Sequence, residues 1–112
     1  MAAKKWNMAA AVASHLVKVD PGTAGWWISL AYAVRRTESV EKAEAILLRA
    51  QAIHPKVAMI AFNLACYASV IGRMEEAKKR LRDAIALDKD IRRLAIDDED
   101  LKPLWDWIRS LE

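Results

Sequence analysis

The sequence repeats with a period of 34 residues, and this period restricts the fold more than any other feature of the chain. Shifting the chain by that length places Pro21 on Pro55 without a gap. Small residues keep one phase in three successive copies, at Ala9, Ala43 and Ala77. A constant period of this size is typical of stacked supersecondary units. The sequence therefore predicts a repeat protein in which each unit buries its apolar face on a neighbour.

The composition favours helices for these units. Hydrophobic residues make up 54% of the chain, many of them are alanine, and only three glycines and three prolines interrupt it. Alanine has the highest helix propensity, so we predict an all-α fold. Ser39 is a suitable N-cap residue, and Gly72 suits a left-handed C-cap. The helices are expected to begin near Trp6, Ala24, Ser39, Lys56, Met74 and Pro103, with a short helix near Ile91.

Two copies of the repeat carry apolar and small residues at matching places. The first has Trp27, Leu30, Ala31, Ala43, Leu47, Ala50 and Pro55, and the second has Ala61, Leu64, Ala65, Gly72, Ala77, Leu81 and Ala84. At this spacing the pattern resembles the tetratricopeptide repeat (TPR). The second copy departs from the family pattern because it lacks the aromatic residue at the first place and the proline at the last. The resemblance implies a right-handed α-α superhelix of TPR helical hairpins.

The same resemblance divides residues 1–112, taken as a single TPR domain, into four parts. Residues 6–22 correspond to the second helix of a truncated repeat, and residues 24–57 and 58–90 to two TPRs. Residues 91–112 are predicted to be a degenerate segment followed by a capping helix. Such a helix would cover the last apolar face of the array. Its apolar stripe is Leu101, Leu104, Trp105, Ile108 and Leu111.

The family resemblance also implies a binding surface. In TPR proteins the first helix of each repeat lines a concave groove that holds a partner peptide or helix. The corresponding residues here are Ile28, Ser29, Tyr32, Arg35 and Arg36 in one repeat and Met59, Phe62, Asn63, Cys66 and Ser69 in the next. Two arginines at one end suit an acidic residue of the ligand. We therefore expect a non-enzymatic module that binds a peptide or a segment of an unidentified protein.

Self-association is the alternative that the sequence leaves open. In the 34-residue register, residues 6–19 align with second helices, so we expect part of this helix to lack a covering neighbour. Large apolar patches rarely stay exposed, so a second copy of the chain could cover this face in a homodimer. The residues predicted for this contact are Trp6, Ala10, Ala13 and Val17.

No pattern in the chain indicates catalysis, a cofactor or a metal site. Neither His15 nor His54 has other ligand residues at metal-binding spacing. Cys66 lies in an apolar helical segment, which is typical of a packed rather than a reactive thiol. The acidic run 97–100 lacks the spacing and the glycine of a calcium loop, so we interpret it as the start of the last helix. We therefore expect a protein that is not an enzyme.

Charge and hydropathy narrow the partners and the compartment. The net charge is only +3, and the basic residues near Lys79 alternate with Glu75 and Glu76, as on a solvated helix face. This distribution does not favour nucleic acid. No run of about 18 apolar residues is present, so we expect no membrane span. With Cys66 as the single cysteine, no internal disulfide can form, and we expect a cytoplasmic protein.

Overall fold

The computed structural model describes residues 2–111, with side chains from residue 5 onward, and all of its secondary structure in that range is helical. This confirms the predicted all-α fold. The elements are α1 (Ala2–Val19), α2 (Ala24–Thr37), α3 (Val40–Ile53), α4 (Ala58–Ile71), α5 (Met74–Leu87), α6 (Ile91–Ala95), the 3-10 helix η1 (Glu99–Leu104) and α7 (Trp105–Ser110).

The helix boundaries reproduce the 34-residue period. Helix α4 begins and ends 34 residues after α2, and α5 begins and ends 34 residues after α3. Helix α1 ends at Val19, which is the counterpart of Ile53 and Leu87 at the ends of α3 and α5. Its start differs from the prediction, because α1 begins at Ala2, one turn before Trp6. The alanines and lysines of that extra turn are good helix formers.

The two predicted caps are both confirmed. The Ser39 side chain accepts a hydrogen bond from the backbone N–H of Lys42 at 3.1 Å, which satisfies one free donor at the start of α3. Gly72 adopts a left-handed conformation with φ 99° after α4. Its N–H and that of Arg73 donate to the Ala68 carbonyl, and this closes the end of the helix.

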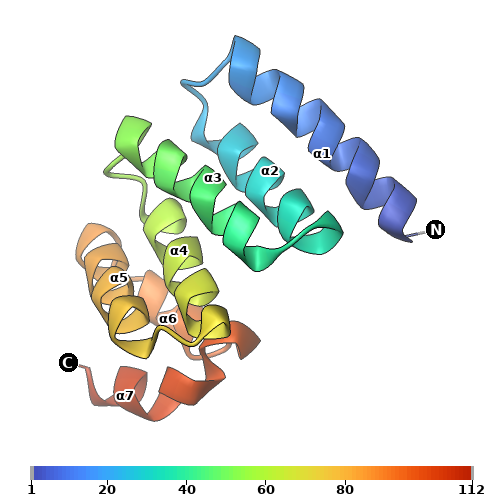
Figure 1. The fold of residues 1–112 in the computed structure, drawn as a ribbon. Coiled ribbons are helices and arrows are strands. Elements are labelled where there is room, and N and C mark those ends of the chain that lie inside the picture. The colour runs from blue at the N-terminus through green and yellow to red at the C-terminus, as the bar shows by residue number, and fades with distance from the viewer. Residues whose placement is uncertain (1, 112) are drawn as a thin grey trace. The chain divides into compact units, whose positions relative to one another are not determined.

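The chain forms two compact units, Met1–Pro55 and Lys56–Glu112. In the first unit α2 packs between α1 and α3 (Figure 1). The Pro21 carbonyl joins the ends of all three helices, because the Trp27 Nε1–H donates to it at 2.9 Å and His54 Nε2 lies 2.8 Å from it. A carbonyl can only accept, so His54 donates through Nε2. The hydrogen bond to Pro21 thereby fixes the buried Trp27 side chain against the turn between α1 and α2.

In the second unit α4 packs on α5, and α6 and η1 cover the rest of α4. The predicted stripe of the last segment is buried at Leu101, Leu104 and Ile108. Helix α7 begins at Trp105, two residues after the start predicted near Pro103, because Pro103 lies inside the preceding 3-10 helix η1. The turn starts earlier because the Asp98 carboxylate accepts the N–H of Asp100 at 2.9 Å and caps η1.

The packing of α4 leads to a stability prediction. Leu64 is fully buried in α4, so Leu64→Asp places an unpaired charge in the core of the second unit. We expect the change to lower the free energy of unfolding by more than about 3 kcal/mol, which is enough to unfold a marginally stable unit. Val70→Asp, at an exposed position of the same helix, is the matched control. Thermal unfolding followed by circular dichroism measures both, and an unchanged melting temperature for Leu64→Asp contradicts the packing described here.

Candidate functional site

Two adjoining apolar hollows lie between α1 and α2, with volumes of about 320 and 400 Å³. Both are lined by Ala9 and Ser29, so they form one continuous depression, called here the α1/α2 groove. These two shared residues, which form its floor, have small side chains. The remaining lining residues are Met8, Val12, Ala13, Leu16 and Trp26 in one hollow and Trp6, Ile28 and Tyr32 in the other.

The repeat register explains why the groove is open. Ala9 is exposed, whereas its counterparts Ala43 in α3 and Ala77 in α5 are fully buried. The same holds for Leu16, which is half-buried although its counterparts Ala50 and Ala84 are fully buried. Helix α3 packs on the preceding α2, and α5 packs on the preceding α4. The face of α1 that carries Ala9 and Leu16 has no helix packed on it among the described residues.

An aromatic and cationic cluster forms one end of the α1/α2 groove. The rings of Trp6 and Tyr32 meet edge to face, with their centroids 5.1 Å apart. The Arg36 guanidinium lies 5.4 Å from the Trp6 ring centre and 5.2 Å from that of Tyr32, and it donates to the Tyr32 hydroxyl at 2.9 Å. The Lys5 ammonium is 6.0 Å from the Trp6 ring. Two positive charges therefore stand beside two aromatic rings at this end.

The two helices of the groove carry charge of one sign only. Neither α1 nor α2 contains an aspartate or a glutamate. Two carboxylates flank these helices directly in sequence. Asp20 accepts hydrogen bonds from the Thr23 hydroxyl and from Trp26 Nε1, and Glu38 pairs with Lys42 at 2.7 Å. The groove is therefore apolar along its length and flanked by positive charge. The basic residues of the two helices are Lys4, Lys5, Lys18, Arg35 and Arg36.

The predicted peptide-binding residues differ in their location and in their burial. Ile28, Ser29 and Tyr32 line the α1/α2 groove, Arg36 stands at its end, and the neighbouring Arg35 is half-buried. In the second unit, Met59 is exposed and Asn63 and Cys66 are half-buried and buried respectively. Phe62 and Ser69 are also buried. The Ser69 hydroxyl donates to the Asp100 carbonyl at 2.7 Å, so a ligand would have to displace η1 to reach it.

The residues predicted for self-association differ in their exposure. Trp6 and Ala10 are half-buried, but Ala13 and Val17 are buried on the side of α1 that packs against α2. Ala13 nonetheless lines one of the two hollows, whereas Val17 lines neither. The open face of α1 is instead formed by residues that the sequence analysis did not select, and Trp26 of α2 was missed as well. The register contained this signal, because Ala9 and Leu16 align with the buried alanines of α3 and α5. The open face consists of Met8, Ala9, Val12 and Leu16.

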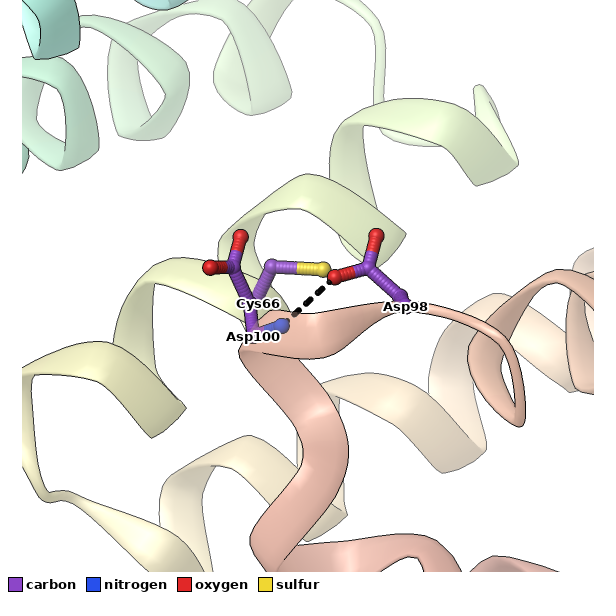
Figure 2. Close-up of side chains that lie close together, drawn as sticks. All are labelled: Cys66, Asp98 and Asp100. Carbon is purple, nitrogen blue, oxygen red and sulfur yellow. Dashed lines mark hydrogen bonds between the residues drawn. The ribbon is translucent and has the colours of Figure 1, made fainter.

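A second group of chemically active side chains lies inside the second unit. Cys66 of α4 and Asp98 and Asp100 at the start of η1 bring their sulfur and carboxylate atoms within 4.8 Å of one another. Figure 2 shows the Cys66 sulfur directed toward the Asp98 carboxylate, which also accepts the Asp100 N–H. Cys66 is buried, as predicted for a packed thiol.

The donor set of this cluster does not match the usual metal sites. Structural zinc takes four ligands that are mostly thiolate and imidazole, whereas this group offers one thiol, two carboxylates and no histidine. Calcium takes six to eight oxygen ligands, roughly, and a buried thiol among them is unfavourable. One carboxylate is also engaged in capping η1. The three side chains lie close together because Asp98 and Asp100 form the cap of η1 and η1 packs on α4, which carries Cys66.

Comparisons of the chain with protein-family models, with curated proteins and with solved structures gave no match. Within the described residues, no helix combines the length and the apolar character that crossing a membrane requires.

The cluster of Cys66, Asp98 and Asp100 gives a direct test with added metal. We expect excess Zn²⁺ or Ca²⁺ to change the melting temperature of the reduced protein by less than about 1 °C, because an incomplete ligand set gives little binding energy to the folded state. Differential scanning calorimetry measures this shift. Cys66→Ala serves as the control, and a metal-dependent rise that this variant abolishes contradicts the interpretation.

Proposed function

We propose that the chain is a TPR-like helical repeat module that binds a segment of another protein in the α1/α2 groove and catalyses no reaction. The observation that supports this most directly is the open apolar face of α1. Met8 and Val12 on this face are 63% and 60% exposed. Contiguous apolar surface of this kind marks interaction sites on proteins that are otherwise well packed.

The chemistry of the groove favours a protein segment over a small molecule. Small-molecule sites place a few convergent polar groups in an apolar pocket. Here the lining residues include no carboxylate, imidazole, thiol or amine, and two of the polar groups have hydrogen-bond partners. Trp26 Nε1 donates to Asp20, and the Tyr32 hydroxyl accepts from Arg36. The hydroxyls of Ser29 and Tyr32 have no imidazole, carboxylate or amine within the same lining to act as a general base, which supports a binding role.

The helix periodicity supports the assignment to a TPR-like repeat. Positions with the family signature, Ala31, Leu47, Ala65 and Leu81, are all fully buried. The paired helices α2–α3 and α4–α5 have the same lengths and the same spacing. A right-handed superhelix of these hairpins is part of the proposal. The binding surface in this proposal lies between α1 and α2, which differs from a groove formed by the first helices of successive repeats.

Self-association is the second candidate, because the open face of α1 continues to Val19, which is 63% exposed. A two-fold pair of α1 helices would cover this stripe. The two candidates share a surface and differ in its occupant, so oligomeric state and partner capture together distinguish them.

The proposed function is tested by blocking the groove. Ala9→Arg places a long side chain over the shared floor of the two hollows, while arginine retains a high helix propensity. Ala11→Arg is the matched control, because Ala11 is exposed on the same helix and does not line the groove. With the purified proteins immobilised in an extract of the source cells, we expect the wild type and Ala11→Arg to retain the same partner. We expect Ala9→Arg to lose it by at least about tenfold, which corresponds to 1.4 kcal/mol.

Circular dichroism of both variants establishes that they fold like the wild type. A partner retained equally by all three proteins contradicts binding in the α1/α2 groove. Enzymatic turnover of a captured partner that survives in Ala9→Arg would contradict the non-enzymatic role.

A further inference from the structure

We propose that the α1/α2 groove receives an amphipathic helix of a second protein, with acidic residues beside its apolar stripe. This inference rests on the proposed function and adds the shape and the charge of the partner segment. It is supported by three observations: the helices that cover the equivalent faces of α3 and α5, the spacing of the exposed residues on α1, and the charge of the groove.

The equivalent faces elsewhere in the chain are covered by helices. The counterparts of Ala9 are buried in α3 and α5, which pack on α2 and α4. Each of these covering helices has 14 residues. Since α1 has the same register and the same small residue at this place, its open face has the form that accepts a helix of similar length.

The residues along the open face have the spacing of a helix–helix seam. Lys5, Ala9, Val12, Leu16 and Val19 follow one another at intervals of four, three, four and three residues. This heptad spacing keeps one stripe turned toward a partner helix over several turns. All five are exposed or half-buried. The seam therefore runs from a charged end at Lys5 through an apolar middle.

The small floor of the groove matches a cylinder better than a bilayer surface. Ala9 and Ser29 allow a helix axis to approach closely, and larger side chains stand on both sides of them. The groove is thus filled by a helix that carries its own ridge of apolar side chains.

The charge of the groove selects acidic over basic partners. The Arg36 guanidinium is exposed and donates one hydrogen bond, to Tyr32, so further N–H groups remain for a carboxylate. Lys5 stands beside the same rings. Because α1 and α2 contain no acidic residue, a glutamate of the partner meets no like charge along either helix.

The same charge argues against a second copy as the occupant. Two α1/α2 grooves placed face to face would bring Lys5 and Arg36 of one copy toward helices that carry only positive charge. Like charges across an interface oppose association. An acidic helix removes this repulsion and gains opposite-charge contacts at the same positions.

The test uses the full chain and three synthetic helical peptides of about 16 residues, since the covering helices have similar length. The first peptide has a leucine and isoleucine stripe flanked by glutamates, the second has lysines in place of the glutamates, and the third is a scrambled form of the first. Fluorescence anisotropy gives the Kd of each. We expect the acidic peptide to bind at least about tenfold more tightly than the other two, and less tightly at high salt.

Charge reversal locates the contacts. We expect Lys5→Glu and Arg36→Glu each to raise the Kd for the acidic peptide by about fivefold and to lower that for the basic peptide, because attraction becomes repulsion. Lys18→Glu is the control, since Lys18 is exposed on α1 but lies outside the seam, and it should change either Kd by less than about twofold. Ala9→Arg should abolish binding of the acidic peptide, and Ala11→Arg should not.

Four results overturn the inference. These are equal binding of the acidic and basic peptides, binding that Ala9→Arg leaves intact, sedimentation showing a dimer that Ala9→Arg dissociates, and binding to phosphatidylserine vesicles without binding to the peptide. The two proposals also fail separately. A captured partner that is lost in Ala9→Arg, together with no binding of the acidic peptide, leaves the groove as a binding site and removes the acidic helix. If Ala9→Arg affects neither capture nor peptide binding, both proposals fail.

Discussion

The close approach of paired helices at fully buried alanines is the constraint on which the rest of this structure depends. Ala31 and Ala43 in the first unit and Ala65 and Ala77 in the second have no exposed surface. A side chain this small lets two backbones approach closely, and the larger leucines beside it fill the remaining space. The same position on α1 is Ala9, where no second helix is packed among the described residues. The small residue that lets helices pack closely within the hairpins therefore also forms the floor of the groove on α1, where no helix covers it.

Much of the fold could be predicted because the repeat encodes it locally. The 34-residue register fixed the ends of α2 to α5 relative to one another, and Ser39 and Gly72 marked two boundaries through their capping chemistry. The last segment was harder to predict. Pro103 is compatible with the first turn of a helix, but the Asp98 side chain starts a 3-10 turn five residues earlier. Pro103 and the Asp98 cap are both local signals for the start of a helix, and the periodicity of apolar residues does not show which one determines it.

The candidate site was predicted only in part, and the reason is geometric. Ile28 and Tyr32 were predicted because first helices line the groove in the family that the sequence resembles, and both line the α1/α2 groove. Ala13 and Val17 were predicted on an uncovered face of α1 but are buried, since an alanine-rich helix has apolar residues on several sides and hydrophobicity alone does not orient it. Comparison with the buried positions of α3 and α5 orients it correctly. Ser69 was predicted to line the groove but is buried. Its hydroxyl donates to the Asp100 carbonyl of η1, an element that the repeat pattern does not include.

The Pro21 carbonyl makes the two hairpins non-interchangeable as building blocks. In the first hairpin this acceptor binds the indole of Trp27 and the imidazole of His54. At the corresponding places the second hairpin has Ala61, which has no donor, and Asp88, whose carboxylate accepts rather than donates. A duplicated second hairpin inserted into the array would reproduce the helices without this junction. Lengthening the protein by copying hairpins would therefore retain this junction only if the first hairpin, with its donors Trp27 and His54, were the one copied.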